Sequence, residues 1–506
     1  MTSVTAILGV TVLTLVVTTL VGIRHSRGNI ETVEALVTAD NTAGIPSLSA
    51  SLIASVLGTW VLFNPPEATV EFGGVTATLG YAVGLALPLA LFASVGVRIR
   101  ELVPHGHSVT EFVLARYGRV MYLVVLVVSA SYMFVFLTVE LTAIAAVLAI
   151  VGGIPPPVTA GTIGLFVLAY TGYGGLIASI VTDTVQTLVL LPLLLIGFGG
   201  FLTVLGGPPT IYERVLATDP ALLSVTTSGV EFCVYIALAL VGATVLNQGI
   251  WQRVYAAEDT QTVRRGFALA AFAVVPAIFL SGLFGLGAAG FGLAEHGGHT
   301  AFFSVLLAAA PSWLVVVVVA IAVLLVMTSA DTLLSGLASL ALRELPRIVE
   351  SVESGGGNHD RDELLAVRAL TALFAVAAIA LASLQFDEIY MLLMVDLLSA
   401  ATFVPVVVGL YTGEVPQWGA VAASVLGFAA GSAVNPTFQA IWGAVLPAWS
   451  LATLPTPSFT ASFLLAVSCS AVVTGVAAVV SEKTIDLGRL ERNLKRLGEE
   501  SGGQPE

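Results

Sequence analysis

Long apolar runs constrain this chain more than any other feature. Runs of about twenty residues that are mostly free of charge recur from the N-terminus almost to the C-terminus. Only 10% of the residues are charged, whereas soluble domains carry about 25%. The chain is therefore predicted to be an all-α polytopic protein of the cell membrane. Its expected surroundings are a lipid bilayer, and no nucleic-acid partner is expected.

Thirteen runs qualify as transmembrane spans. They cover residues 3–23, 45–66, 74–97, 120–151, 157–174, 176–205, 229–250, 266–291, 312–341, 364–384, 389–412, 417–435 and 458–481. Thirteen crossings put the two termini on opposite sides of the membrane. With the N-terminus outside, all Lys and Arg residues except Arg214 lie on the cytoplasmic side. This charge asymmetry predicts an N-out/C-in topology.

The spans group into two halves. Residues 45–205 and 229–412 hold five spans each, spans two to six and spans seven to eleven. Because each half has an odd number of crossings, the second half runs opposite to the first, which predicts a 5+5 inverted repeat. Outside this core lie a first helix at 1–23, two C-terminal helices at 417–481 and a cytoplasmic tail at 482–506.

The first span of each half carries helix-breaking residues. Gly58 lies within the run 45–66, which ends at Pro65 and Pro66, and Asn247 follows a glycine in the run 229–250. Irregular backbone at membrane depth is tolerated where it lines a polar cavity. Two interrupted spans in corresponding positions indicate a transporter site between the halves.

A polar stretch closes the apolar run of span nine. Thr328 and Ser329 are hard oxygen donors, and Asp331 adds a charge in the next turn. Together with the Leu325 carbonyl, the two hydroxyls are predicted to coordinate a small dehydrated cation. The alternative is structural, since such hydroxyls also bond back to their own helix or across to a neighbour.

Four carboxylates lie inside predicted spans: Glu140, Asp183, Asp331 and Asp396. A charge in mid-bilayer costs about 2.5 to 3.5 kcal/mol on insertion scales, so it faces a cavity or a partner. The sequence predicts no Lys or Arg deep enough to pair with them, so a mobile cation or a proton is expected to supply the charge. Protonated or hydrogen-bonded packing residues are the alternative. The loop histidine pairs His105/His107 and His296/His299 are predicted to be solvated, without a metal cluster.

Three motifs in order resemble the sodium:solute symporter family. They are Tyr173-Gly-Gly-Leu176 with Thr182-Asp-Thr-Val-Gln186, Asn247-Gln248 with Gln252-Arg253, and Met327-Thr-Ser-Ala-Asp-Thr332. The resemblance implies a LeuT-type fold and a Na⁺ site where the broken second span meets span nine. By position the ligands are the carbonyls of Ala54, Leu57 and Leu325 and the hydroxyls of Thr328 and Ser329, with Asp183 nearby on the inward release path. Val56 stands where amino-acid-transporting members often have Asp.

The same resemblance implies a solute site beside the ion, between spans two, three, seven and eleven. The candidate residues are Thr59, Trp60, Glu67, Tyr81, Thr244, Asn247, Gln248 and Asp396. The segments 249–253 and 107–118 are most similar to the urea-permease branch. That similarity implies a small neutral polar solute, with urea as the leading choice.

The predicted function is secondary active transport: Na⁺-coupled symport of a small polar organic solute by alternating access. The chain is not expected to be an enzyme. Asp183 and Asp396 are not flanked by the glycine motif that an intramembrane aspartyl protease needs. Na⁺ is the only predicted cofactor, as the coupling ion. A proline-type symporter, a H⁺-coupled symporter and a transporter-like nutrient sensor stay open as alternatives. The sequence leaves the oligomeric state open.

Overall fold

A computed structural model describes residues 4–26, 42–103, 108–294, 298–349, 359–445, 456–481 and Leu487. In these ranges the chain is helical, apart from one isolated bridge between Ala43 and Ala257. Up to residue 204 the elements are α1 (Val4–Ser26), α3 (Ile45–Val56), η1 (Thr59–Leu62), α4 (Asn64–Glu71), α5 (Gly74–Leu102), α6 (Val109–Tyr117), α7 (Arg119–Gly152) and α8 (Pro156–Val204). After it come α9 (Gly207–Thr218), η2 (Pro220–Leu223), α10 (Thr227–Leu246), α11 (Gln248–Ala256), α12 (Thr260–Gly290), η3 (Gly298–Thr300), α13 (Ala301–Ala309), α14 (Ser312–Val349), α15 (His359–Ala382), α16 (Glu388–Tyr411), α17 (Gln417–Val434), α18 (Pro436–Val445) and α20 (Phe459–Val480).

The all-helical prediction is confirmed, and the number of spans is confirmed only in part. Ten helices of the described chain are long and apolar enough to cross a membrane, and the bent pair of α3 with η1 and α4 makes eleven. The predicted spans 157–174 and 364–384 correspond to the shorter apolar stretches Pro156–Ala169 and Arg368–Ala382. The count of thirteen crossings therefore stays a prediction.

The separation between predicted spans five and six differs from the prediction. The structure has one continuous helix, α8, over both runs. The predicted boundary between the two runs fell at Gly175, beside Gly174. Glycine lowers helix propensity by about 1 kcal/mol but keeps its N–H group, so helical hydrogen bonding continues through such a pair.

The first predicted helix break is confirmed. α3 ends at Val56, Leu57 and Gly58 are extended, and the chain resumes with η1 and α4 at an angle of 60°. α4 restarts with Pro65 and Pro66 in its first turn, where a proline costs no hydrogen bond.

The second predicted break is also confirmed. α10 ends at Leu246, and Asn247 is extended. The Asn247 side chain accepts a hydrogen bond from the Gly249 amide at 2.9 Å and so caps α11. The two breaks fall in the first span of each predicted half.

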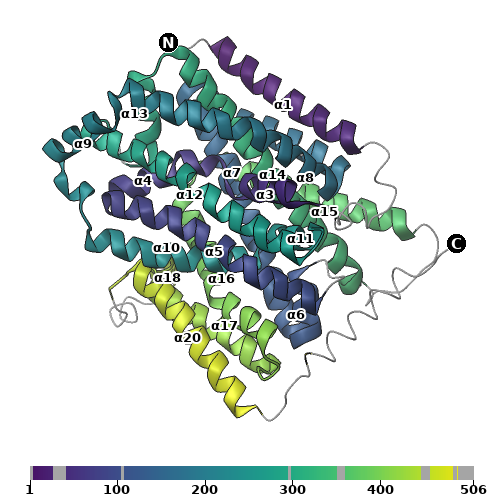
Figure 1. Ribbon diagram of the computed structural model, residues 1–506. Helices are drawn as coiled ribbons and strands as arrows, with labels where there is room; N and C mark the ends of the chain where they lie inside the picture. Colours follow the sequence, from purple (N-terminus) through teal and green to yellow (C-terminus); the bar gives the residue numbers. More distant parts are fainter. Residues whose placement is uncertain are drawn as a thin grey trace.

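The interior is built around α14. This helix packs against α7, α8 and α1, while the broken α3 packs against α8, α12 and α14. Figure 1 shows α1 along one edge of the bundle and α17 with α20 along the opposite edge. The central helices, which contain both breaks, therefore lie between these outer layers.

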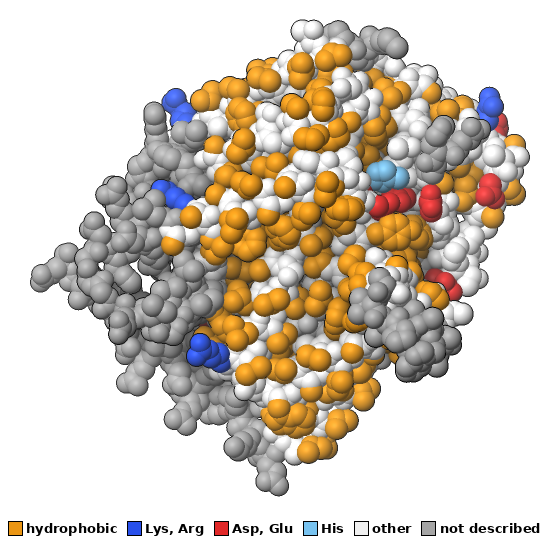
Figure 2. Space-filling view, turned by 180° about the vertical axis from the view of Figure 1, so that it is seen from behind, with side chains coloured by type: hydrophobic (Ala, Val, Ile, Leu, Met, Phe, Trp, Pro, Cys, Tyr) orange, Lys and Arg blue, Asp and Glu red, His pale blue; other side chains and the backbone are white. Residues whose placement is uncertain are grey.

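The surface matches a protein surrounded by lipid. Figure 2 shows hydrophobic side chains covering a broad band, with blue Lys and Arg groups mainly towards one end and red Asp and Glu groups towards the other. Exposed apolar residues such as Leu13, Leu188, Phe272 and Val479 belong to helices on the outside of the bundle. The chain is a multi-pass membrane protein.

Short helices occupy several connections. α6 lies between α5 and α7, and α13 lies between α12 and α14. The connection 206–228 contains α9 and η2. The predicted tail 482–506, apart from Leu487, and His105, His107 and His296 lie outside the described residues.

Candidate functional site

The break after α3 releases backbone carbonyl groups. The Leu57 amide makes the last helical bond, to the Ile53 carbonyl at 3.0 Å. In a continued helix the Thr59 amide would bond to Ser55, but it donates to Oε2 of Glu140 at 2.8 Å. The final carbonyls of a helix have no partner within it, so those of Ala54 and Leu57 are available as ligands.

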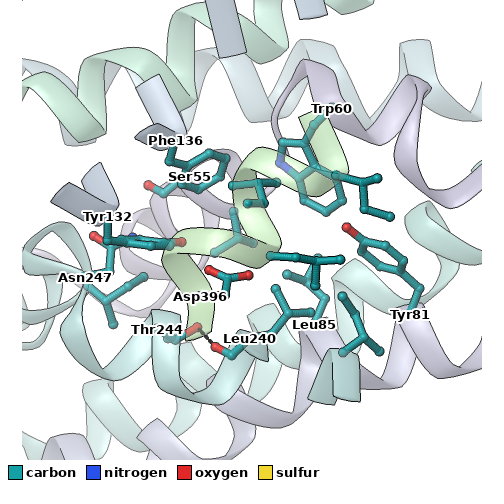
Figure 3. A pocket seen from close by; sticks show the side chains of 16 residues that line it. Ser55, Trp60, Tyr81, Leu85, Tyr132, Phe136, Leu240, Thr244, Asn247 and Asp396 are labelled. Atoms are coloured by element: carbon teal, nitrogen blue, oxygen red, sulfur yellow. Dashed lines mark hydrogen bonds between the residues drawn. The ribbon is translucent and has the colours of Figure 1, made fainter. Parts of the chain in front are cut away.

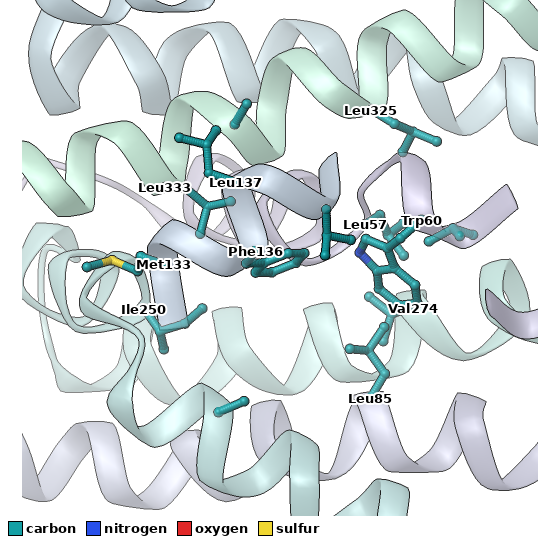
Figure 4. Close-up of a cluster of buried hydrophobic side chains, with 14 of the residues drawn as sticks. Leu57, Trp60, Leu85, Met133, Phe136, Leu137, Ile250, Val274, Leu325 and Leu333 are labelled. Atoms are coloured by element: carbon teal, nitrogen blue, oxygen red, sulfur yellow. The ribbon is translucent and has the colours of Figure 1, made fainter. Parts of the chain in front are cut away.

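Two side-chain contacts hold the break against α14. Thr59 Oγ1 donates to the Ala322 carbonyl at 3.2 Å, and Ser55 Oγ lies 3.0 Å from Thr332 Oγ1. These contacts flank the break on both sides, so the stretch of α14 between residues 322 and 332 runs beside it. Figure 4 shows Leu57, Trp60 and Leu325 near one another at one end of a buried cluster. The structure thus brings together the two segments of the predicted Na⁺ site.

The hydroxyls of the predicted ion site bond to their own helix. Thr328 Oγ1 and Ser329 Oγ each donate to the Leu325 carbonyl at 2.9 Å, and both side chains are fully buried. A hydroxyl has one proton and two lone pairs, so these bonds leave oxygen lone pairs free. Buried hydroxyl and carbonyl oxygens are the donors that a hard cation prefers. The residues present fit a Na⁺ ion.

The predicted absence of a basic partner is wrong for Asp183. Arg253 Nη2 lies 3.1 Å from Asp183 Oδ2, and both side chains are fully buried. Ser51 donates to the same oxygen at 2.7 Å. Arg253 was expected on the cytoplasmic side, but α11 follows the Asn247 break and carries its guanidinium into the bundle.

The Arg253 guanidinium connects the broken helix to α14. Its Nη2 also donates to Thr332 Oγ1 at 2.7 Å, and its Nε donates to Ser51 Oγ at 3.0 Å. Asp331, the carboxylate beside Thr332, accepts a hydrogen bond from Ser179 of α8. We call Ser51, Asp183, Arg253 and Thr332 the Arg253 network. It links α3, α8, α11 and α14 at the end of the bundle where α11 lies.

A buried cavity lies beside the break. It is lined by Ser55, Val56, Trp60, Tyr81, Leu85, Tyr132, Phe136, Ile236, Leu240, Thr244, Asn247, Ile250, Ile389, Leu392, Leu393 and Asp396. Its volume of about 40 Å³ holds roughly three water molecules. The rings of Trp60 and Tyr81 stack with centroids 5.5 Å apart on one side, as Figure 3 shows. The elements that contribute are α3, η1, α5, α7, α10, α11 and α16.

Asp396 gives the cavity a carboxyl group. Figure 3 shows its carboxylate among the labelled cavity residues, and only 3% of the residue is exposed. Its Oδ1 atom has no hydrogen-bond partner in the described part of the chain. A buried carboxylate oxygen without a partner is costly, so this atom is suited to bind a donor group of a solute.

Five of the eight predicted solute residues line the cavity: Trp60, Tyr81, Thr244, Asn247 and Asp396. The structure places the other three elsewhere. Thr59 faces α14 and Glu140, because η1 turns it away from the cavity. Gln248 accepts a hydrogen bond from the Val109 amide of α6 at 3.1 Å, so its side chain lies beyond the cavity.

Glu67 is the third residue outside the cavity, and it belongs to a separate cluster. His299 Nδ1 lies 3.3 Å from Glu67 Oε2, and His299 Nε2 lies 3.3 Å from Glu388 Oε2. The ring of Phe63 stacks on His299 at 5.0 Å. We call Glu67, His299 and Glu388 the His299 cluster; it ties α4 to η3 and α16.

His299 was predicted to be solvated, but its side chain is only 32% exposed. Burial of the ring alone would lower the pKa of His299. The hydrogen bond to Glu67 and the charge of Glu388 outweigh burial and raise this pKa to about 9. The imidazole is therefore charged at neutral pH and bridges two carboxylates. Figure 2 shows a histidine beside acidic groups on the surface.

Sequence reasoning placed Glu140 inside a span but did not assign α7 to the site. Tyr132 and Phe136 line the cavity, and Glu140 lies at the helix break. These three residues are spaced four apart, so they share one face of α7. An aromatic pair in register with an intramembrane glutamate was the available signal, because such a face is expected to point to a polar cavity.

The profile of the sodium:solute symporter family matches residues 37–427 of this chain. The spermidine transporter DUR31 of Candida albicans is 27% identical over 374 residues, which cover 72% of this chain and 67% of that protein. The urea-proton symporter DUR3 of Oryza sativa subsp. japonica is 29% identical over 188 residues. That match covers 36% of this chain and 26% of the rice protein.

Among solved structures, a Na⁺-coupled sialic acid symporter in a substrate-bound outward-open state is similar in fold. The TM-score is 0.74 at 15% identity, and the match covers 95% of this chain and 99% of that one. The helices described above therefore form a LeuT-like fold.

Proposed function

Because the chain belongs to the sodium:solute symporter family, we propose that it carries a small polar organic solute across the membrane together with Na⁺. The observation that carries this proposal is the break of α3 against the Thr328–Ser329 face of α14. Carbonyl and hydroxyl oxygens gather there without access to water, and the solute cavity lies on the other side of the same break.

The coupling follows from this shared element. An ion that bridges the Ala54 and Leu57 carbonyls to Thr328 and Ser329 fixes the unwound segment against α14. The same segment carries Trp60 into the cavity wall. Ion binding therefore favours solute binding, and linkage requires the solute to favour the ion by an equal factor.

The ties at the two ends of the broken span support alternating access. α3 is held at one end by the Arg253 network, and α4 is held at the other end by the His299 cluster. Opening to either side requires one set of ties to break while the other stays closed. Rigid-body movement of one helix group against another around a fixed site is how such transporters alternate.

A urea-like molecule is the solute that we propose first. The cavity of about 40 Å³ suits a compact solute, and Asn247, Thr244 and Asp396 offer hydrogen-bonding groups. An amine is the second candidate, because the Asp396 carboxylate and the stacked rings of Trp60 and Tyr81 suit a positive charge. The similar proteins include a spermidine transporter and a urea-proton symporter, which agrees with both candidates.

The test is uptake by purified protein in liposomes, with radiolabelled urea, spermidine and proline, with and without a Na⁺ gradient. We expect Na⁺-stimulated uptake of a nitrogen-rich solute, and we expect the double variant Thr328→Ala/Ser329→Ala to lose the stimulation. At a membrane potential of 100 mV one Na⁺ supplies about 2.3 kcal/mol, or nearly fifty-fold accumulation.

Ser339→Ala is the matched control, since this buried serine lies on α14 but contacts Gln248 beyond the cavity. It is expected to keep Na⁺ stimulation. Full Na⁺-dependent uptake by the Thr328/Ser329 double variant would disprove the ion site. Uptake driven by a pH gradient in the absence of Na⁺ would instead establish H⁺ coupling, and binding without transport would favour a sensor.

A further inference from the structure

Glu140 of α7, one of the four carboxylates predicted inside the spans, lies at the break of the first broken span. The residue is fully buried, and its Oε2 atom accepts the Thr59 amide at 2.8 Å. A Cβ atom added to Gly58 would lie 1.6 Å from Glu140 Oε1. The carboxylate therefore fills the space that the glycine leaves open at the break.

The same carboxylate faces the predicted ion ligands. The side chains of Ser329 and Thr59 both interact with it. Ser329, however, donates its single proton to the Leu325 carbonyl, and Thr59 Oγ1 donates to Ala322. Among the described hydrogen bonds the Thr59 N–H group is thus the one donor to this carboxylate, and Oε1 of Glu140 has no hydrogen-bond partner in the described structure.

No cationic side chain compensates Glu140 among the described ion pairs. The buried Arg253 is committed to Asp183. A buried carboxylate without a counter-charge is costly, and acceptor oxygens that face one another repel. A cation placed between Glu140, the released carbonyls and the α14 hydroxyls removes both penalties at once.

We propose that the Glu140 carboxylate is a direct ligand of the coupling Na⁺ and supplies the negative charge that neutralises it. This inference rests on the proposed function, and it adds an anionic ligand from a third helix to an ion site otherwise made of neutral oxygens. The ion then joins α7 to the break and to α14, so that three elements move together when the ion is bound.

The experiment is binding of ²²Na⁺ to purified protein, without solute. Glu140→Gln is the informative variant, because the amide oxygen of Gln still accepts the Thr59 N–H group while the charge is lost. We expect its Kd for Na⁺ to rise by about 10- to 100-fold, the range seen when supporting ligand groups at metal sites are removed. Glu140→Asp keeps the charge and is expected to restore part of the affinity.

A second variant displaces the carboxylate and leaves it in the chain. In Gly58→Ala the new methyl group occupies the position of Oε1. The end of a glutamate side chain is flexible, so the fold tolerates the change while the carboxylate moves away. This variant is also expected to weaken Na⁺ binding. Thr142→Val is the control on α7, since that hydroxyl bonds only to the Thr138 carbonyl of its own helix.

The outcomes separate this inference from the proposed function. One outcome is that the wild type binds Na⁺ saturably, that binding depends on Thr328 and Ser329, and that Glu140→Gln binds Na⁺ with the same Kd. This outcome would overturn the inference and leave the proposed function intact. No saturable Na⁺ binding by the wild type would overturn both. If Glu140→Gln does not fold, an unchanged Kd in both Glu140→Asp and Gly58→Ala overturns the inference.

Discussion

The pair of Asp183 and Arg253 shows how a charged residue is kept inside this bundle. Its two members come from α8 and α11, and neither side chain reaches the surface. A buried ion pair adds little net stability compared with apolar residues of the same shape. Loss of one member, however, leaves the other as an unpaired buried charge. The pair is therefore a matched unit, and Ser51 and Thr332 complete its hydrogen bonds.

This matching predicts a strongly non-additive pair of substitutions. Arg253→Met is expected to lower the free energy of unfolding by about 3 to 5 kcal/mol, because Asp183 stays buried without its partner. Adding Asp183→Asn to that variant is expected to restore more than half of the loss. Denaturant unfolding in detergent micelles, arranged as a double-mutant cycle, measures the coupling. If the two losses simply add, the residues act independently.

At the scale of helices, the breaks were predictable because their causes are local. Gly58, Pro65 and Pro66 disrupt helical bonding in their own segment, and Asn247 caps the helix that follows it. A polar environment around Thr328 and Ser329 was also predictable, since adjacent hydroxyls in an apolar run need a polar neighbour. Each of these signals lies within a few residues of its effect.

Contacts between distant helices were not predictable in this way. Asp183 and Arg253 are 70 positions apart, and Glu140 meets Thr59 over 81 positions. Periodicity says which residues share a face of α7, but it does not say which helix that face meets. Glu67 was assigned to the solute site by its span, whereas the 60° bend of that span carries it into the His299 cluster.

The His299 cluster predicts a pH-dependent contact between α4 and α16. The pKa of His299 in the folded protein, about 9, is above the ordinary value of 6.5 for histidine. A raised pKa means that the stabilisation from the protonated ring is lost as the pH rises from 6.5 through about 9. Above that pH the carboxylates of Glu67 and Glu388 repel each other, so α4 is expected to separate from α16.

Thiol labelling measures this opening. Leu85→Cys, in the cavity wall, is placed in a background with both Cys233 and Cys469 replaced by serine. Labelling by a membrane-impermeant reagent is expected to accelerate between pH 8 and pH 10. His299→Gln carries the same thiol but no titrating ring, so it corrects for the reagent's own pH dependence. An identical acceleration in both proteins would contradict the role of His299.

At the scale of the whole molecule, the distribution of charge predicts the orientation in the membrane. Basic residues gather mainly towards one end of the apolar band and acidic residues towards the other (Figure 2). Cytoplasmic loops carry an excess of Lys and Arg, and that bias sets the direction of insertion. The basic end is therefore expected to face the cytoplasm, with the acidic groups outside.

Two exposed positions on either side of the second broken span test this orientation. Thr218, at the end of α9, and Arg265, near the start of α12, are separated by the short η2 and by the two helices α10 and α11. If these two helices together make one crossing, the positions lie on opposite sides of the membrane. In the cysteine-free background, Thr218→Cys is expected to react with an impermeant reagent in intact cells, and Arg265→Cys only after permeabilisation. The reverse pattern would invert the topology, and labelling of both in intact cells would make α10 and α11 a re-entrant loop.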